Sequence, residues 1–394
     1  MLQGVNVALG VSGSIAAVKV VELAHELRRQ GANVRAVVTD SARGIVHPWA
    51  VEFATDNPVV TEITGRVEHV ELCGRDGWAD VLLLAPATAN TVGKIAAAVD
   101  DTPVTTCATT ALGAGMPVVV APAMHEPMYD HPGVLDAIDR VESWGVSFVD
   151  PRIEEGKAKI ATEEAIVTDV ARATTERTLS GKRVVVTSGA TSERIDPIRV
   201  LTNRASGRTG REVARACYVR GADVTLVHDG PDVPYASVER VESAAEMLAA
   251  VEAACAGDEA DDVAPADALV SAAAISDFTV DAADEKIRSG ESRTLDLRPT
   301  PKLVDAVRDA RPDLPIVGFK AETAGDDESM VAEAKRILDR ASLSFVVAND
   351  ASVMGEDATR ALFVRESGLT GEYEGDKAGL GGRVADELAA ELGA

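Results

Sequence analysis

Short runs of Val, Ile and Leu alternate along this chain with longer segments in which apolar residues recur every three or four positions. The runs predict buried strands and the longer segments predict amphipathic helices, an alternation typical of parallel βαβ units. Expected helices include residues 17–30 and 210–220, which precede Gly31 and Gly221, two glycines well suited to ending a helix. The expected strands are residues 5–10, 33–39, 80–85, 117–122, 183–189, 223–228, 267–272, 315–319, 345–349 and 362–366.

The order of elements repeats between the two halves of the chain. Residues 24–39 and residues 214–229 each contain the end of a helix, a Gly-Ala turn and a strand. A chain of 394 residues is long enough for two domains with separate cores. The polar segment 168–182 precedes the first strand of the second half, which is where a domain boundary belongs. We therefore predict an α/β fold with two Rossmann-like domains, residues 1–178 and residues 179–394.

The balance of charge bears on the partners of the chain. It carries 64 acidic and 39 basic residues, a formal net charge of −25, and only ten of the basic residues are lysine. The acidic residues are spread along the whole chain, so we interpret them as a solvated surface. A lysine-poor acidic surface resembles those of proteins from salt-rich cytoplasm, where 1 M salt screens charges within about 3 Å. The charge argues against nucleic acid and anionic membranes as partners.

Other global features favour a cytoplasmic protein. No apolar run reaches the length of about 18 residues that a membrane span needs. Residues 1–10 enter a strand without a charged region or cleavage site, so we expect no signal peptide. The four cysteines are scattered and form no CxxC pair, which predicts neither a disulfide framework nor a zinc site.

Polar residues follow three expected strands of the first half. The loop 10-GVSGSIAA-17 opens a helix whose N–H groups could hold a phosphate, although a plain tight turn is the alternative. It has neither the GxGxxG spacing nor the Lys-Ser/Thr of a Walker loop. Residues 39–41 and 88–90 end the next two strands, and parallel strand ends meet at one sheet edge, where ligands bind. Capping of helix N-termini is the alternative role for Thr88 and Asn90.

Two histidines are candidate site residues. His69 lies beside two glutamates in 66-RVEHVEL-72, and an ordinary surface histidine is its alternative interpretation. His125 lies among prolines and methionines in 121-APAMHEPMY-129, a stiff loop that follows a buried strand. Loops of this kind often shape a binding site.

The second half offers a second candidate anion site. Asn203, Ser206 and Gly207 precede an expected helix start at Gly210. Asp277 follows an expected strand, and Lys286 comes nine residues later. A carboxylate and a lysine near strand ends suit a metal–triphosphate site, with the acid on Mg²⁺ and the lysine on phosphate. Both residues could instead be surface charges.

Taken together, these segments resemble the bifunctional coenzyme A biosynthesis family, in which a phosphopantothenoylcysteine decarboxylase is fused to a phosphopantothenate–cysteine ligase. The resemblance runs nearly end to end. GVSGSIAA, APATAN and PAMHEPMY resemble the flavin-binding decarboxylase half. The segments that resemble the ligase half, in the expected order, are SGATSERIDPIR, TNRASGRTG, SAAAISDF, EKI, VGFKAET and VVAND.

For the first domain, the resemblance implies a flavodoxin-like fold that binds FMN. The FMN would oxidise the cysteine-derived thiol, which allows the adjacent carboxylate to leave, and would then return the hydride. His69 matches the family's catalytic histidine, a base for the thiol proton. The implied FMN contacts are Gly13, Ser14 and Ile15 at the phosphate, with Thr39, Ser41, Thr88 and Asn90.

For the second domain, the resemblance implies a ligase with a mostly parallel sheet that uses CTP and Mg²⁺. The carboxylate of 4′-phosphopantothenate would attack CTP to give an acyl-cytidylate, which the amine of cysteine then consumes. Lys286 matches the lysine needed to form this intermediate and Asn203 the asparagine that helps to consume it. The implied nucleotide contacts are Ser271, Ala272, Ala273, Asp277 (also the metal ligand), Lys286, Pro301, Lys302, Leu303, Val304, Phe319 and Lys335.

The sequence departs from the family pattern at three points. His125 replaces an asparagine that binds the substrate carboxylate, and a histidine can still donate a hydrogen bond there. The segment 150–165, which normally carries a proton-donating cysteine, has none, leaving Lys157, Lys159 or water as hypotheses. A second nucleotide-binding lysine after Lys335 is missing, and Arg340 is a candidate substitute.

The resemblance also implies a homo-oligomer, with flavin domains in trimers that place FMN at subunit contacts and ligase domains in pairs. We expect an archaeal, salt-adapted enzyme that makes 4′-phosphopantetheine from 4′-phosphopantothenate, cysteine and CTP. One alternative is a ligase fused to a flavin domain with lost or altered decarboxylase chemistry. Others are a flavin prenyltransferase or another flavin-dependent cysteine decarboxylase with an unrelated C-terminal domain, and a non-catalytic flavoprotein that regulates or scaffolds.

Overall fold

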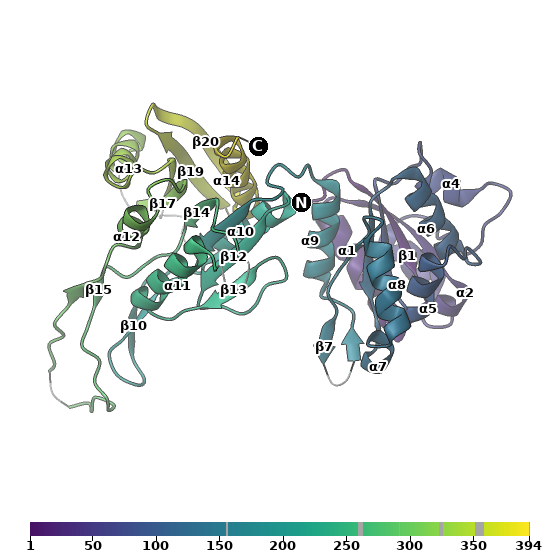
Figure 1. Ribbon diagram of the computed structural model, residues 1–394, viewed down its shortest axis with the longest axis horizontal. Coiled ribbons are helices and arrows are strands. Elements are labelled where there is room, and N and C mark those ends of the chain that lie inside the picture. Colours follow the sequence, from purple (N-terminus) through teal and green to yellow (C-terminus); the bar gives the residue numbers. More distant parts are fainter. Residues whose placement is uncertain (155–156, 259–262, 291, 323–325, 351–357, 394) are drawn as a thin grey trace. The chain divides into compact units, whose positions relative to one another are not determined.

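The computed structural model describes residues 1–154, 157–258, 263–290, 292–322, 326–350 and 358–393. It contains two compact units, Met1–Thr175 and Glu176–Ala394, which divide a few residues before the predicted boundary. Each unit has its own sheet, with helices on both faces (Figure 1). The predicted α/β class is confirmed.

The first unit is built on a five-stranded sheet in the order β2-β1-β3-β4-β6, with all neighbours parallel. Every residue of its central strand β3 is buried, as expected for a parallel strand covered on both faces. A small antiparallel sheet, β5-β8-β7, lies beside α7. The strands are β1 Asn6–Val11, β2 Asn33–Val38, β3 Val81–Ala87, β4 Val118–Pro122, β5 Met124–His125, β6 Ser147–Phe148, β7 Arg152–Glu154 and β8 Lys157–Lys159.

The helices of this unit mostly follow the predicted pattern. The segment predicted as one helix at 17–30 is a short 3₁₀ helix followed by α1, and Gly31 then has φ +98°. The helices are η1 Ile15–Lys19, α1 Val20–Arg29, α2 Asp40–Arg43, α3 Pro48–Thr55, α4 Glu68–Cys73, α5 Ala89–Ala96, α6 Pro103–Ala114, α7 Glu126–Tyr129, α8 Pro132–Glu142 and α9 Glu163–Thr174.

The second unit is built on an eight-stranded sheet in the order β13-β12-β9-β14-β17-β18-β19-β20. The strands from β13 to β18 are parallel, whereas β19 and β20 are antiparallel and leave β20 at the edge. The strands are β9 Arg183–Thr187, β12 Asp223–His228, β13 Ser237–Arg240, β14 Ala268–Ser271, β17 Ile316–Glu322, β18 Phe345–Asp350, β19 Ala358–Arg365 and β20 Gly368–Asp376. Two antiparallel pairs of short strands lie outside this sheet: β10 Ser192–Arg194 with β11 Val200–Thr202, and β15 Phe278–Thr279 with β16 Arg298–Pro299.

Two cores cover the faces of this sheet. Val213, Cys217, Leu380 and Val384 belong to one core, and Met247, Val307 and Leu338 belong to the other. The helices are α10 Arg208–Val219, α11 Ala244–Ala256, α12 Leu303–Ala310, α13 Asp327–Ala341 and α14 Lys377–Glu391. Helix α10 begins at Arg208, before the predicted start at Gly210, because Gly207 with φ +68° ends the preceding loop.

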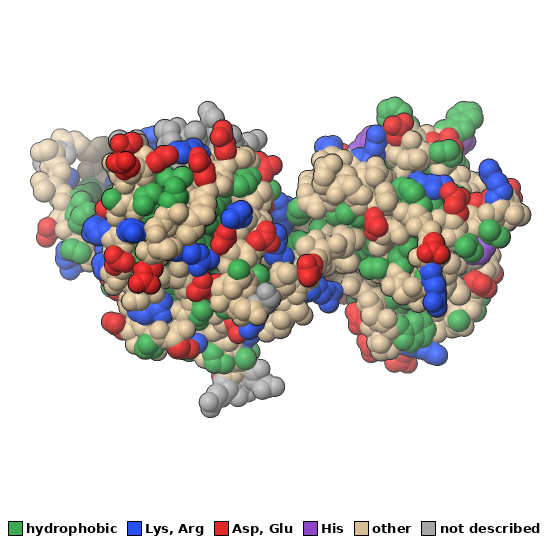
Figure 2. Space-filling view, turned by 90° about the horizontal axis from the view of Figure 1, so that it is seen from above, with side chains coloured by type: hydrophobic (Ala, Val, Ile, Leu, Met, Phe, Trp, Pro, Cys, Tyr) green, Lys and Arg blue, Asp and Glu red, His purple; other side chains and the backbone are tan. Residues whose placement is uncertain are grey.

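Acidic and basic side chains are interspersed on the face of each unit that Figure 2 shows. Exposed ion pairs occur among the described residues, such as Arg360 with Asp327 at 2.8 Å. No helix within the described ranges is both long and apolar enough to cross a membrane.

Candidate functional site

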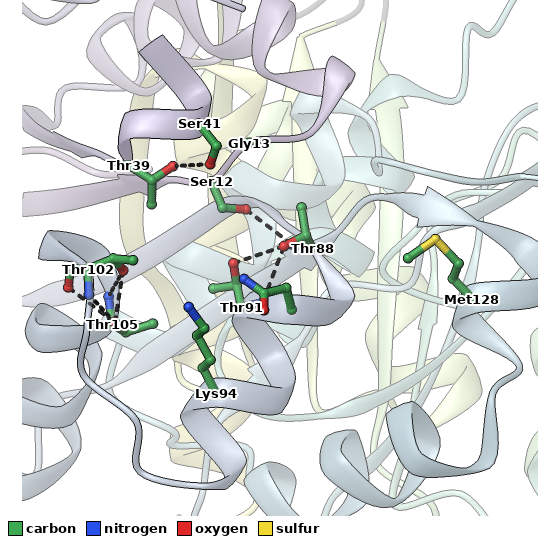
Figure 3. Close-up of a pocket in the computed structure, with 11 residues that line it drawn as sticks. Ser12, Gly13, Thr39, Ser41, Thr88, Thr91, Lys94, Thr102, Thr105 and Met128 are labelled. Atoms are coloured by element: carbon green, nitrogen blue, oxygen red, sulfur yellow. Dashed lines mark hydrogen bonds between the residues drawn. The ribbon is translucent and has the colours of Figure 1, made fainter. Parts of the chain in front are cut away.

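The loops after β1, β2 and β3 meet around a cavity of about 250 Å³, here named the polar cavity (Figure 3). Hydroxyl groups dominate its wall, and they come from strand ends and from the first turns of α5 and α6. The lining residues are Ser12, Gly13, Thr39, Ser41, Thr88, Asn90, Thr91, Lys94, Thr102, Thr105 and Met128.

Close packing fixes these loops. A Cβ on Gly13 would lie 2.4 Å from Ser41 Oγ, so only glycine fits at this position. Ser12 Oγ donates to the Pro86 carbonyl at 2.7 Å and accepts from the Thr88 N–H at 3.1 Å, which joins the β1 loop to the end of β3. The wall of the polar cavity is therefore made of loops that are packed and hydrogen-bonded to one another.

Of the two capping roles considered for Thr88 and Asn90, only that of Thr88 is present, because Asn90 lies inside the first turn of α5. Thr88 Oγ1 accepts from the Thr91 N–H, and Thr39 Oγ1 accepts from the Ala42 N–H, both at 3.2 Å. Both threonines still line the polar cavity, so capping and ligand contact are compatible. Lys94 is paired with both Asp101 carboxylate oxygens at 2.8 Å, which offsets its charge beside the polar cavity.

A second cavity of about 550 Å³, the apolar cavity, shares Gly13, Thr88 and Met128 with the polar cavity. Its wall combines η1, the segment around β5 and the small antiparallel sheet. Methionine and aliphatic side chains form most of this wall, and Lys19, Arg152 and Lys159 add positive charge to it. The other lining residues are Ser14, Ile15, Ala16, Val18, Lys19, Ala123, Met124, His125, Arg152, Ala158, Lys159 and Ile160.

The second unit has a cavity of about 680 Å³, the cationic cavity, at the carboxyl ends of β9, β14, β17 and β18. Ser188 Oγ donates to the Gly207 carbonyl at 2.6 Å, and Thr187 Oγ1 accepts from the N–H groups of Ala272 and Ala273 at 3.1 Å. The lining residues are Gly189, Arg204, Ala205, Ser206, Gly207, Arg208, Thr209, Gly210, Ala272, Ala273, Ala274, Ile275, Asp277, Phe319, Lys320, Ala321, Asn349, Thr359 and Lys377.

Positive charge distinguishes the cationic cavity. Arg204, Arg208, Lys320 and Lys377 line it, against one carboxylate, Asp277, that is itself paired with Lys302. Arg208 and Lys377 are the first residues of α10 and α14, so two helix N-termini add their partial positive charge. This arrangement suits a polyanion such as a triphosphate.

Comparisons with known proteins agree with both halves. The family model described as "Flavoprotein" matches residues 1–175, and that described as "DNA/pantothenate metabolism flavoprotein C-terminal domain" matches residues 179–392. The coenzyme A biosynthesis bifunctional protein CoaBC of Thermococcus kodakarensis is 48% identical over 368 residues, which cover 92% of this chain and 89% of the relative.

Two further relatives with the same name come from Methanocaldococcus jannaschii and Bacillus subtilis. The first is 33% identical over 98% of this chain and 94% of the relative, and the second is 34% identical over 90% and 88%. The chain belongs to this family. It is a bifunctional enzyme of coenzyme A biosynthesis, a flavoprotein with decarboxylase and ligase activities.

In the first unit, the residues that the family resemblance assigned to FMN all line the two cavities. Thr39, Ser41 and Asn90 line the polar cavity, Ser14 and Ile15 line the apolar cavity, and Gly13 and Thr88 line both. His125 and Lys159 line the apolar cavity, whereas the side chain of Lys157 lies outside the described residues.

His69 is the exception, since it lines neither cavity. It lies on α4, and its Nδ1 is buried without a hydrogen-bond partner among the described residues. The turn before it is held by Glu68, whose carboxylate accepts from the hydroxyl and the N–H of Thr64. The Thr64 hydroxyl, backbone N–H groups and Arg66 outweigh partial desolvation and lower the pKa of Glu68 to about 2.

In the second unit, the predicted nucleotide contacts divide into two groups. Ala272, Ala273, Asp277 and Phe319 line the cationic cavity. Asn203 borders it, because its Nδ2 donates to the carbonyls of Ala274 and Ile275 at 3.0 and 3.2 Å. The predicted residues that do not line it are Ser271, Lys286, Pro301, Lys302, Leu303, Val304, Lys335 and Arg340.

The structure gives several of these residues other surroundings. Leu303 is buried in a core, and Arg340 forms an ion pair with Asp305 at 2.8 Å. Lys335 Nζ lies near the β19–β20 turn, 3.9 Å from where a Cβ of Gly368 would be. Lys286 is exposed on the long loop between β15 and β16.

Sequence reasoning missed several residues of the cationic cavity. Arg204 and Arg208 lie inside the segment TNRASGRTG and could have been included with it. Lys377 and Asn349 come from the last third of the chain, and no motif connects Lys377 with the other residues of the cavity. Within the described ranges, no group of three or more His, Cys, Asp or Glu residues is placed to hold a metal ion.

Proposed function

We propose that residues 1–178 form an FMN-dependent phosphopantothenoylcysteine decarboxylase domain and residues 179–394 a CTP-dependent phosphopantothenate–cysteine ligase domain. The observation that carries this assignment is the contrast between the cavities. The first domain has a hydroxyl-lined cavity adjoining an apolar one, whereas the second has a cavity lined by four cationic side chains. The first pair suits a phosphorylated flavin and the second cavity suits a nucleoside triphosphate.

The residues of the first domain fit FMN. Glycine at position 13 lets the loop after β1 pack directly against Ser41. The hydroxyls of Thr39, Ser41 and Thr88 can donate to phosphate oxygens or to a polyol chain. Ile15, Met124 and Met128 offer apolar surface for a flat ring. When bound, FMN would supply the two-electron oxidation and the return of hydride that this decarboxylation needs.

Three side chains of the first domain act on the substrate in this proposal. His125 donates a hydrogen bond to the substrate carboxylate at the wall of the apolar cavity. Lys159, on the same wall, takes the place of the missing cysteine as the final proton donor. His69 accepts the thiol proton. Because His69 lines neither cavity of its own chain, we propose that it completes the site of a second copy, within a trimer of flavin domains.

In the ligase domain, the 4′-phosphopantothenate carboxylate attacks the α-phosphorus of CTP and pyrophosphate leaves. The cysteine amine then attacks the acyl carbon of the acyl-cytidylate and CMP leaves. Lys286 supports the first step by neutralising charge on the phosphates, and Asn203 orients the second reaction. Mg²⁺ would be held mainly by the nucleotide, since Asp277 supplies the carboxylate in this cavity and Mg²⁺ commonly uses one or two protein carboxylates.

Lys377 takes the triphosphate-binding role that the sequence had assigned to Lys335 and Arg340. It lines the cationic cavity and forms no ion pair with any described residue, so its ammonium group is available to a phosphate. Arg340 is engaged by Asp305 and Lys335 lies elsewhere. Ligase domains pair in the proposed assembly, as in the family resemblance.

We also propose an archaeal enzyme of a salt-rich cytoplasm, supported by the net charge of −25 and by the acidic side chains distributed over the surface that Figure 2 shows. The decisive experiment is mass spectrometry of the purified chain in concentrated KCl with 4′-phosphopantothenate, cysteine, CTP and Mg²⁺. We expect 4′-phosphopantetheine, CMP, pyrophosphate and CO₂. ATP in place of CTP is the control for nucleotide choice.

Two variants separate the halves in the same assay. His69→Asn should keep the flavin absorbance and accumulate phosphopantothenoylcysteine, and Asn203→Ala should accumulate the acyl-cytidylate. Accumulation of phosphopantothenoylcysteine by the unaltered chain would show that the flavin domain has lost or changed its reaction. Normal turnover by Asn203→Ala would contradict the role given to that residue.

A further inference from the structure

The loop that carries Lys286 is held by the β10–β11 hairpin at three places. Thr279 Oγ1 donates to Glu193 Oε2 at 2.8 Å, the Ala283 N–H donates to the Ile195 carbonyl at 2.9 Å, and the Ile287 N–H donates to Asp196 Oδ2 at 3.1 Å. Figure 1 shows this loop beyond β15, beside the loop that follows β10. Lys286 therefore lies on a short span fixed at both ends, at Ala283 and Ile287.

Asp196 is the most heavily bonded of these anchors. Asp196 is only 2% exposed to solvent. Oδ1 accepts from the N–H groups of Ile198 and Arg199, both at 2.8 Å, and so closes the hairpin turn. Oδ2 bonds the loop that carries Lys286, because it accepts from the N–H of Ile287. It also accepts from the Arg199 guanidinium at 2.5 Å.

Arg199 completes the link. The same guanidinium nitrogen that contacts Asp196 also donates to the Ile287 carbonyl at 3.0 Å. Both backbone groups of Ile287 are thus bonded to the turn, one to Asp196 and one to Arg199. Burial opposes ionisation of Asp196, but the three backbone N–H groups and Arg199 outweigh it and lower its pKa to about 2. The link therefore stays charged throughout the neutral range.

We infer that Asp196 is a positioning residue for Lys286, because its Oδ2 fixes Ile287 and thereby sets where the neighbouring lysine can reach. The inference rests on the proposed role of Lys286 in forming the acyl-cytidylate. Asp196 acts on the backbone of the loop and has no direct part in the reaction. Misplacement of a catalytic group by about 1 Å can lower a rate by about 100-fold, so the loss of this anchor should be costly.

Asp196→Asn tests the inference sharply. An asparagine can keep Oδ1 on the two N–H groups of the turn, but its Nδ2 then faces the N–H of Ile287 and the Arg199 guanidinium, which are also donors. The turn is preserved while the bond to the loop is lost. Asp284→Asn is the matched control, because this substitution removes the same charge. Asp284 is exposed on the same loop, two residues from Lys286.

The assay is acyl-cytidylate and pyrophosphate formation by the full chain without cysteine. We expect Asp196→Asn to be slower by about 10-fold to 100-fold, and Asp284→Asn to remain within about 2-fold of the unaltered chain. Decarboxylation of added phosphopantothenoylcysteine should not change in either variant, which shows that the flavin half is folded and carries flavin.

A double-variant cycle separates positioning from general loss of structure. If Asp196 acts through Lys286, Asp196→Asn with Lys286→Ala should be no slower than Lys286→Ala alone, since coupled residues are non-additive. Multiplied losses, or an unchanged rate in Asp196→Asn, would overturn the inference while leaving the role of Lys286 intact. Full activity in Lys286→Ala would instead remove the proposed role of the lysine, and the inference with it.

Discussion

The two halves of the molecule place their predicted site residues in different ways. In the flavin half, every predicted FMN contact lies in a loop or helix start directly after a parallel strand, and all of them line two adjoining cavities. In the ligase half, residues near strand ends line the cationic cavity, but Lys286, Lys335 and Arg340 do not. The edge of a parallel sheet brings strand-end residues together by topology alone. Residues on long loops and helix surfaces depend on tertiary contacts.

If the strand-end loops form each site independently, a substitution that distorts one loop should abolish the activity of that half only. Gly13→Ala places a Cβ 2.4 Å from Ser41 Oγ, and Gly210→Ala places one 2.7 Å from Ser188 Cβ. Forced shifts of this kind cost ~1–3 kcal/mol, which corresponds to about 5-fold to 150-fold in affinity. We expect Gly13→Ala to lose flavin absorbance with normal ligation, and Gly210→Ala to lose ligation with normal flavin content.

Gly93→Ala and Gly382→Ala are the controls for this pair. A Cβ on Gly93 meets nothing within 4 Å, and one on Gly382 meets Arg220 at an ordinary 3.5 Å. Both lie in helices, α5 and α14, where alanine is favoured over glycine. Loss of both activities in Gly13→Ala would mean that the halves do not function independently.

A smaller effect, on the KM for CTP, should distinguish Lys377 from Lys335 in the ligase half. Lys377→Ala removes a cation from the wall of the cationic cavity, and a lost phosphate contact of about 1.4 kcal/mol raises the KM for CTP about 10-fold. The KM of Lys335→Ala for CTP should stay within about 2-fold of that of the unaltered chain, because Lys335 lies near Gly368 and does not line the cationic cavity. Steady-state kinetics at varied CTP measure both. A larger effect in Lys335→Ala would restore the assignment made from sequence.

The smallest effect concerns Glu68, which holds the turn before His69. Its pKa is lowered from 4.5 to about 2, so the ionised carboxylate stabilises the folded state above pH 4.5, and this contribution disappears as the pH falls through 2. Thermal unfolding of the flavin half in Glu68→Gln should therefore lack part of the acid sensitivity of the unaltered chain. We expect the difference in Tm between the two to narrow below about pH 4.5. A constant difference would show that folding does not lower the pKa of Glu68.

Hydrophobic pattern predicted the large parallel strands well, because a strand buried on both faces is a continuous apolar run. The segment 223–228 coincides with β12, and 80–85 lies within one residue of the start of β3. The short strands of the two antiparallel pairs were not predicted. β10 is Ser-Glu-Arg and β15 is Phe-Thr, segments without an apolar run that become strands only because a partner pairs with them.

The same limit explains what was missed in the site. Lys377 follows β20 by one residue and is far in sequence from the motifs, so only the fold brings it beside Arg208 and Asp277. The Asp196–Ile287 contact likewise joins two loops with no shared pattern. His69 was a candidate from its sequence context and received its catalytic role from the family resemblance, but its own chain does not bring it to either cavity.

The composition of the edge strand β20 opposes aggregation of the enzyme through its sheet edge. Glu372, Glu374 and Asp376 are exposed along it, and Glu372 is covered further by Arg360. A register shift between Phe363 and Val364 also distorts the neighbouring strand. A second copy approaching this edge meets carboxylates where a flat, bare backbone would invite strand addition. High salt screens the long-range repulsion between copies, so these short-range features of the edge protect against edge-to-edge aggregation more than the net charge does.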